Sequence, residues 1–182
     1  MQPIDFVGFA SDCTITGKLT MFGDRLTDFL NGQERFRVHH LECESLADGR
    51  RVGVDSLSVE RNDLMVVVAT GPRGSERQRV SLQTKRMQVS IGPYLILGRL
   101  HTNAGSDPVA SVMKRDPMIP LTHVTIAYEM AGSIVARDIP TVIVNRLLVD
   151  WISATTDAAS LFPDIPTRSP FAAGMISRVS RS

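Results

Sequence analysis

Hydrophobic and polar residues alternate along several short stretches of the chain, as is typical of β-strands with one buried face. In residues 14–21 the inward positions begin with Ile15 and Gly17 and continue at every second place. Residues 94–102 repeat this pattern, and Gly98 matches Gly17 at a distance of 81 positions. Residues 64–69 and 147–152 are nearly continuous apolar runs, which predicts strands that are buried on both faces.

A longer pattern occurs twice. Residues 24–69 align without a gap with residues 107–152, which lie 83 positions later. The matched pairs include His40 with His123, Gly49 with Gly132, Asp55 with Asp138, and Asn62 with Asn145. The sequence therefore predicts a tandem duplication of a small β-rich module.

A short helix is expected near the start of each copy. In the first copy, Asp24 is the expected N-cap of an apolar stripe at Leu26, Phe29 and Leu30, and Asn31-Gly32 is an expected left-handed stop. In the second copy, Asp107 is the expected N-cap, and Pro108 occupies the first helical position, where a backbone N–H has no partner within the helix. The apolar stripe of this second helix consists of Val109, Val112 and Met113.

The strand after each helix changes phase in its middle. Before His39-His40 the inward residues are at even positions (Phe36 and Val38), and after it they are at odd positions (Leu41 and Cys43). The inward residues change from odd to even positions in the same way at Thr122-His123. A strand that changes its inward face needs one extra residue, so a β-bulge or sharp bend is predicted at both places. Asn62 and Asn145, which precede the last strands, are expected to be turn residues in the left-handed conformation.

These elements predict a mainly β protein with two tandem, pseudo-symmetric β-barrel or half-barrel modules, each with one short helix, and an extended C-terminal tail. The expected boundaries are 1–71 for the first module, 72–93 for connecting strands, 94–152 for the second module and 153–182 for the tail. Modules this small are expected to pack against each other.

Composition narrows the range of functions. The 182 residues have a net charge of +1, so no global field attracts nucleic acid or membrane. Apolar runs are too short to cross a membrane, and residues 1–12 lack the features of a signal peptide, so cytoplasmic residence is expected. Cys13 and Cys43 form no paired motif and are expected to be structural thiols in a reducing compartment.

Candidate chemistry is sparse. The histidines His39, His40, His101 and His123 would form a metal site only if the modules brought them together, and Asp55 and Asp138 would form a carboxylate pair only in the same way. No nucleophile, phosphate-binding or dinucleotide motif occurs in the sequence. The expectation is therefore a protein that is not an enzyme and has no catalytic residues, cofactor or metal.

Two segments are candidates for binding. The first is a basic stretch whose anion-binding candidates are Arg73, Arg77, Arg79, Lys85 and Arg86. Aromatic residues make up only 5% of the chain and none lies among these charges, so nucleic acid is not the expected partner. The second is the proline-containing tail, whose partner-binding candidates are Leu161, Phe162, Phe171, Met175, Ile176, Arg178, Val179 and Arg181.

The stretches RLTDFLN, FRVHHLECES and TVIVNRLLVDWI make residues 13–152 resemble an uncharacterised bacterial family of small, Sm-like β-barrel domains. This resemblance implies a fold and assigns no activity or site residues. The asparagine-containing loop with which Sm proteins bind RNA bases has no counterpart in this chain.

Three hypotheses follow. The first is a non-enzymatic scaffold or accessory subunit whose tail docks on a larger assembly, such as the cytoplasmic face of a photosynthetic or energy-converting membrane complex, with anionic lipid beside it. This hypothesis places the protein in the cytoplasm, peripheral to the inner membrane. The second is a nucleic-acid-binding barrel that uses residues 73–86. The third is a sensor or enzyme with a small-molecule site between the modules.

Overall fold

The protein is mainly β in the computed structural model, which describes residues 2–21, 25–71 and 83–155. Ten strands form one antiparallel sheet with the order β10-β6-β7-β8-β9-β5-β1-β2-β3-β4. The first half of the chain contributes β1 (Gln2–Phe9), β2 (Cys13–Met21), α1 (Leu26–Gly32), β3 (Arg35–Ser45), β4 (Arg51–Glu60), η1 (Arg61–Asp63) and β5 (Val66–Val68). The second half contributes β6 (Gln83–Ile91), β7 (Tyr94–Thr102), α2 (Pro108–Met113), β8 (Met118–Met130), β9 (Ser133–Asn145), η3 (Arg146–Leu148) and β10 (Trp151–Ala154).

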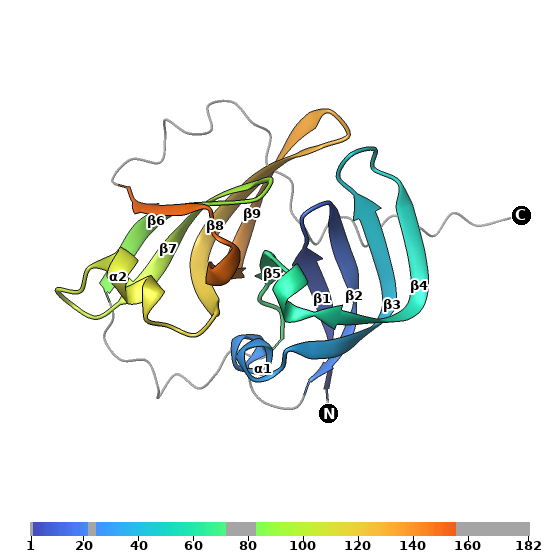
Figure 1. The fold of residues 1–182 in the computed structure, drawn as a ribbon, viewed down its shortest axis with the longest axis horizontal. Coiled ribbons are helices and arrows are strands. Elements are labelled where there is room, and N and C mark those ends of the chain that lie inside the picture. The colour runs from blue at the N-terminus through green and yellow to red at the C-terminus, as the bar shows by residue number, and fades with distance from the viewer. Residues whose placement is uncertain (1, 22–24, 72–82, 156–182) are drawn as a thin grey trace, which may run out of the picture.

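The two halves have the same sequence of elements and the same strand pairing. In the first half, β5 returns to pair with β1, so that Gly8 lies opposite Val67. In the second half, β10 returns to pair with β6 in the same register, with Val89 opposite Ile152. Figure 1 shows the halves beside each other, with β5 between them.

The residues that correspond between the halves are not always 83 positions apart. The first hairpin leaves β3 after Ser45 and enters β4 at Arg51, whereas β8 and β9 are joined by the two residues Ala131 and Gly132, both with positive φ. Positive φ at both central residues is typical of a type I′ turn. Beyond the hairpins the paired strands therefore correspond at 85 positions (Val67 and Ile152), so the gapless alignment predicts the wrong pairs there.

Both predicted bends are β-bulges. Gly17 lies opposite two residues, His40 and Leu41, because the register shifts between Thr16 and Lys18. Gly98 lies opposite His123 and Val124 in the same way. In each bulge the first residue is the histidine, and in each it has a positive φ. The phase change in the hydrophobic pattern correctly located this irregularity.

The helices differ from expectation in their caps. Leu26 and Leu30 of α1 are buried as predicted, but Arg25 occupies the N-cap position, and Asp24 lies outside the described residues. Asn31-Gly32 is not a left-handed stop, because neither residue has positive φ. Asp107 caps α2 as expected, since its side chain accepts a hydrogen bond from the Val109 backbone N–H.

Residues 83–91, which were expected to connect the modules, form β6, and this strand pairs with β7 and β10 within the second half. The first half begins with the matching strand β1, which sequence reasoning did not identify. Each half therefore has five strands. Strand β1 lies within the bounds of 1–71 expected for the first module, whereas the second half begins with β6, before the expected boundary at residue 94.

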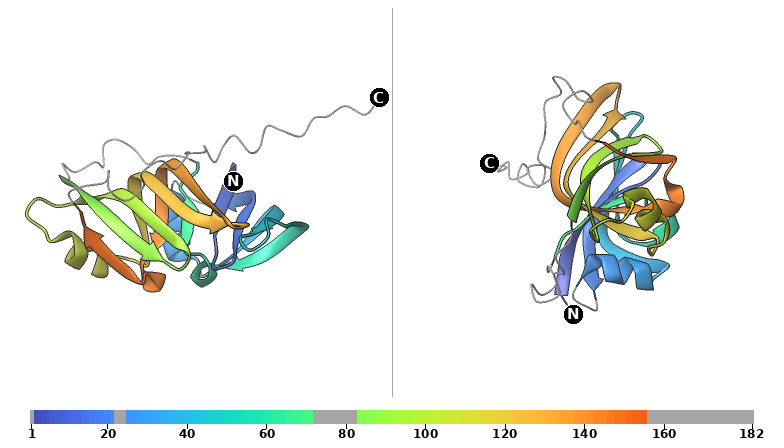
Figure 2. Two further views of the ribbon diagram at one scale, coloured as in Figure 1. Left: turned by 90° about the horizontal axis from the view of Figure 1, so that it is seen from above. Right: turned by 90° about the vertical axis from the view of Figure 1, so that its left-hand side faces the viewer.

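The halves are joined where β5 pairs with β9, with Val66 opposite Val144, Val67 opposite Ile143 and Val68 opposite Val142. Val66 and Val68 pack into the core of the second half, while Ile143 and Met118 pack into the core of the first. The views in Figure 2 show the continuous sheet curving from one half to the other.

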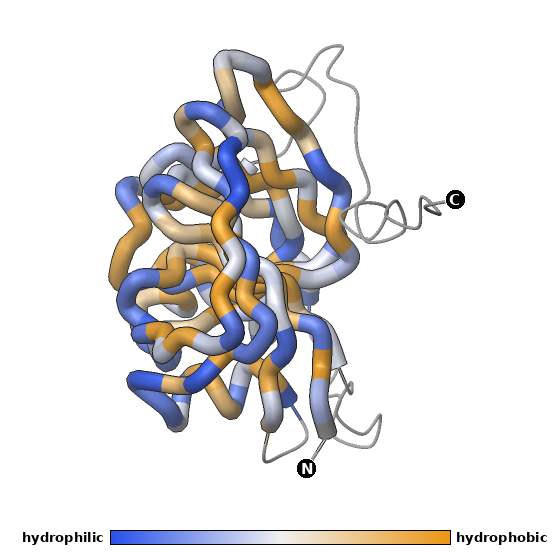
Figure 3. The backbone as a smooth tube through the Cα atoms, turned by 90° about the vertical axis from the view of Figure 1, so that its right-hand side faces the viewer, coloured by the Kyte–Doolittle hydropathy of each residue, from blue (hydrophilic) through white to orange (hydrophobic). Residues whose placement is uncertain are grey.

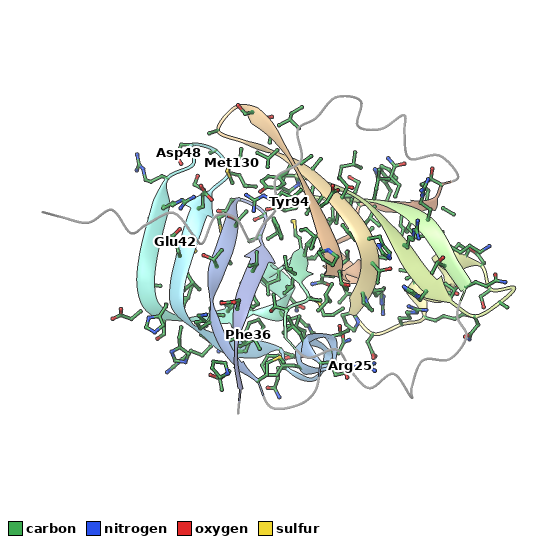
Figure 4. The ribbon with its side chains drawn as sticks, turned by 180° about the vertical axis from the view of Figure 1, so that it is seen from behind. Arg25, Phe36, Glu42, Asp48, Tyr94 and Met130 are labelled. Atoms are coloured by element: carbon green, nitrogen blue, oxygen red, sulfur yellow. The ribbon has the colours of Figure 1, made fainter. Side chains whose placement is uncertain are left out.

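Aromatic and polar contacts reinforce this junction. Phe9 meets Tyr94 and Tyr128 edge to face, at centroid separations of 5.4 and 5.8 Å. The Tyr94 hydroxyl donates to the Ala10 carbonyl at 2.6 Å, and Tyr94 lies near the middle of the molecule in Figure 4. Buried Asn145 donates to the Leu64 carbonyl at 3.2 Å. These contacts make the two halves one packed body.

Candidate functional site: the edge strands β4 and β10

The described residues leave two strands at the edges of the sheet, β4 and β10, each with a single neighbour. Residues 51–58 of β4 are all exposed, although three of them are large and apolar. Val52, Val54 and Leu57 are 58%, 44% and 47% exposed. A long edge strand with exposed apolar side chains is a template for pairing with another chain.

These side chains lie on the face of the sheet that forms the core. Val54 is opposite Leu41, which is 2% exposed, and Leu57 is opposite Val38, which is fully buried. Directly paired residues of antiparallel strands share a face, so the apolar row of the core continues onto β4. No other strand of the described part of the chain lies beyond it. Figure 3 views the molecule from the side where β4 lies.

Strand β9, the counterpart of β4 in the second half, shows how the same positions are buried when another part of the protein packs against them. At a distance of 85 positions, Val54 corresponds to Ile139 and Leu57 to Val142, and these residues are 2% and 0% exposed. Both belong to a core cluster to which the first half contributes Phe9 and Leu46. The same positions are therefore buried in β9, where another module packs, and exposed in β4.

The charges around β4 do not protect its edge. Arg51 pairs with two glutamates of β3, Glu44 at 3.0 Å and Glu42 at 3.4 Å, and Glu42 is labelled in Figure 4. Arg35 pairs with Glu60 at the other end of the strand. The sequence of β4, RVGVDSLSVE, contains neither the lysine nor the proline with which proteins usually block an edge, and only Asp55 adds a charge in its middle.

The opposite edge, β10, also exposes an aromatic residue. Trp151 is 45% exposed and corresponds to Val66, which is fully buried where β5 meets β9. Leu147, in η3 just before this strand, is 55% exposed. Of the seven exposed large apolar side chains among the described residues, these two and the three on β4 lie at or beside the two edges.

The structure does not bring the predicted histidines and aspartates together. His40 is on β3 and His123 on β8, with four strands between them in the sheet, and both side chains are exposed. The same number of strands separates Asp55 on β4 from Asp138 on β9, and Asp138 accepts a hydrogen bond from Thr125 at 2.6 Å. In the described ranges, no three His, Cys, Asp or Glu side chains are grouped as a metal site requires.

The two asparagines are not equivalent, and neither is left-handed. Asn145 has φ of −80° and caps η3 by accepting from the Leu147 N–H, whereas Asn62 is an exposed residue within η1. Neither appears among the residues with positive φ. The expectation of left-handed turn residues was wrong for both, because each belongs to the start of a 3₁₀ helix.

Several binding candidates fall outside the described residues. These are Arg73, Arg77 and Arg79 of the basic stretch and all the tail candidates, Leu161, Phe162, Phe171, Met175, Ile176, Arg178, Val179 and Arg181. The remaining two, Lys85 and Arg86, are exposed side chains of β6. The anion-binding and tail-docking predictions therefore stay predictions.

The two cysteines are neighbours on β2 and β3. Both side chains are half-buried and pack beside the core of the first half. Burial raises the pKa of Cys13 to about 12, and the nearby Cys43 and Asp12 add to this effect. Burial also raises the pKa of Cys43. Both thiols are protonated at neutral pH and are poor nucleophiles.

Comparisons with protein-family models, with curated proteins and with solved structures found no match. None of the described helices has the length and apolar character needed to cross a membrane. The candidate site rests on the exposed apolar side chains of the two edge strands among the described residues. The sequence contains the apolar residues of β4, but nothing in it shows which strand lies at an edge.

Proposed function

We propose that the protein is a non-enzymatic scaffold or accessory subunit, built from two tandem small barrels of Sm-like type, that docks on a larger assembly. The observation that supports this proposal is the uncovered apolar row on β4. A strand of a partner added to this edge would satisfy the free backbone groups of β4 and cover Val52, Val54 and Leu57. Covering each half-exposed side chain would contribute about 1 kcal/mol.

The tail is a second proposed attachment. Its apolar residues, among them Phe171 and Ile176, follow a proline-containing stretch and are costly to leave in water. Two attachments on one partner would reinforce each other, because binding of one raises the effective concentration of the other. We place the docking at the cytoplasmic face of a membrane complex, as the sequence suggested.

Affinity capture from the native cell with the full chain tests this proposal. Val54→Lys and Leu57→Lys would put a charge in the row and are expected to lose the captured partner. Ile134→Lys is the matched control, since Ile134 is 64% exposed and lies on β9 near the hairpin tip rather than on an edge strand. Capture of the same partner by all four proteins would contradict docking through β4.

Deletion of residues 161–182 tests the tail separately. We expect co-purification to be lost and the melting temperature to stay nearly unchanged, because each half already has a buried core among residues 2–21, 25–71 and 83–155. A truncated chain that retains its partner would remove the tail from the proposal. A large drop in melting temperature would instead mean that the tail is part of the fold.

A further inference from the structure

The two halves of the chain are joined where the edge strand of one half, β5, pairs with the edge strand of the other, β9. The repeat makes β9 the counterpart of β4 and β5 the counterpart of β10, as the matching registers of β5 on β1 and β10 on β6 require. The two edges that stay open in the described sheet are thus the same two kinds that are joined inside it.

We propose that β4 of one copy of this chain pairs with β10 of a second copy, so that molecules associate head to tail. This inference rests on the proposed function, because it uses the same β4 edge and names its partner. The partner of β4 is therefore the antiparallel strand β10 of another copy, and the pairing of β5 with β9 is the model for this contact.

The pairing of β5 with β9 also fixes the register. Inside the chain, Val66 lies opposite Val144, Val67 opposite Ile143 and Val68 opposite Val142. Moving each residue by 85 positions to its counterpart places Trp151 opposite Val59, Ile152 opposite Ser58 and Ser153 opposite Leu57. Trp151 would then take the position of Val66, which packs into the core of the neighbouring module.

The distribution of exposed apolar residues agrees with this pairing. Val52, Val54 and Leu57 lie on one open edge, and Trp151 lies on the other. Association of the two edges in this register would cover Trp151 and Leu57, whereas Val54 and Val52 lie beyond the end of β10. The counterparts of four residues that bridge the internal junction, namely Phe9, Leu46, Met118 and Ile143, are Ser90, Glu129, Arg35 and Ser58. Fewer apolar contacts make this contact weaker than the internal one and reversible.

Head-to-tail contacts are heterologous, because each uses two different surfaces. Such a contact leaves one free β4 and one free β10 at the ends of every open row. A row of copies would therefore still offer a β4 edge to a further partner, as the proposed function requires.

Sedimentation of the full chain from about 10 µM to about 1 mM, the range in which weak contacts form, tests the inference. The average mass is expected to rise with concentration. Leu57→Lys damages the β4 edge and Trp151→Lys the β10 edge, so each variant alone is expected to stay monomeric. A mixture of the two has one intact β4 and one intact β10, so it is expected to form a 1:1 dimer that grows no further.

Ile134→Lys is the control at an exposed apolar side chain away from both edges and is expected to associate like the original chain. Melting curves confirm that each variant folds. A variant that fails to fold is replaced by cross-linking of two chains with Cys13→Ser and Cys43→Ser, one carrying Leu57→Cys and the other Ser153→Cys. Oxidation should join this pair, and should not join Val52→Cys with Ser153→Cys.

A wild-type chain that stays monomeric throughout, a mixture that stays monomeric, or a Trp151→Lys variant that still associates would each overturn the inference. The proposed function survives these results if Leu57→Lys still loses its captured partner. Conversely, head-to-tail association together with unchanged capture by Leu57→Lys would refute the proposed docking and leave the inference standing.

Discussion

His40 and His123 share a left-handed backbone conformation, with φ of 47° and 50°. Each is the first residue of a bulge, and each is followed by a buried apolar residue that resumes the inward row. Left-handed φ is uncommon for residues other than glycine, although histidine tolerates it better than most. The duplicated histidine is therefore explained by backbone geometry, because both side chains are exposed and neither has a hydrogen bond or ion pair among those found in the described residues.

Substitution of His40 tests this explanation. His40→Gly is expected to keep or slightly raise the free energy of unfolding, because glycine adopts positive φ without steric cost. His40→Val is expected to lower it by about 1–2 kcal/mol, because a β-branched side chain clashes in this conformation. The comparison is made by urea denaturation, with His39→Val as the control at an exposed neighbour with ordinary φ. Equal effects of both valines would contradict the backbone explanation.

The glycines opposite the bulges are needed for a different reason. A Cβ at Gly17 would stand 2.5 Å from Cγ1 of Val38, and one at Gly98 would stand 2.9 Å from Cγ2 of Val124. The bulge pushes the facing strand so close that only a hydrogen fits. Hydrophobic periodicity alone treats these glycines as small inward residues and does not indicate this role.

Gly17→Ala is expected to lower the free energy of unfolding by about 1–3 kcal/mol through overpacking. Gly98→Ala is expected to cost less, because its closest contact is longer. Gly53→Ala serves as the control, since its Cβ would meet nothing closer than the Leu41 carbonyl oxygen at 3.8 Å. Thermal unfolding of the three variants gives the order, and a Gly53→Ala variant as unstable as Gly17→Ala would contradict it.

Sequence patterns predicted what depends on neighbours in the chain. The inward positions of β2, β3, β7 and β8, the buried leucines of α1 and the two bulges all follow from local alternation and its interruption. The stripe expected for α2 was only partly right, because Val112 is buried but Met113 is 61% exposed. The pairing of β5 with β9 could not be predicted in this way, since both strands are simply apolar. Because β5 pairs with β9, β4 is left at the edge of the sheet. The hydrophobic pattern of the sequence therefore could not predict the candidate site.

Register was lost for a related reason. The alignment at 83 positions matched Val59 with Val142. In the sheet, however, Val59 lies opposite Phe36, and the counterpart of Phe36, Ile119, lies opposite Val144. Val59 therefore corresponds to Val144. Valine and isoleucine recur so often along β9 that a shift of two residues keeps the apolar pattern intact. Only the turn geometry fixes the register, and the two hairpins have different turns.

Asn31 is a further feature that local pattern mispredicted. Its side chain accepts from the Met118 N–H at 2.9 Å and donates to the Met118 carbonyl at 3.1 Å. It thereby acts as one more rung of sheet between helix α1 of the first half and strand β8 of the second. The partner is 87 residues away, so the sequence showed only an asparagine before a glycine.

Asn31→Ala leaves both Met118 groups without these partners and is expected to lower the free energy of unfolding by about 1–3 kcal/mol. Asn31→Asp removes only the donor and is expected to cost less. Exchange of the Met118 amide hydrogen, measured by NMR, should accelerate in the alanine variant more than in the aspartate variant. Unchanged protection in both variants would show that the contact does not hold the halves together.

The buried thiol of Cys13 should make the free energy of unfolding vary with pH in the alkaline range. Its folded-state pKa is raised to about 12 by burial, while an unfolded cysteine ionises near pH 8.5. The neutral thiol is thus favoured by folding. Its contribution is fully present below about pH 8.5 and is lost as the pH rises toward the folded-state pKa, because the unfolded chain then binds fewer protons than the folded one.

We therefore expect the free energy of unfolding to fall between about pH 8.5 and pH 11, and to fall less steeply in Cys13→Ala. Burial also raises the pKa of Tyr94 and Tyr128, but both tyrosines are present in the two proteins, so their effect largely cancels in the comparison. Urea denaturation at several pH values gives both slopes. Parallel slopes would mean that Cys13 ionises as easily in the folded protein as in the unfolded chain. In that case iodoacetamide would also modify it at the rate of an ordinary exposed thiol.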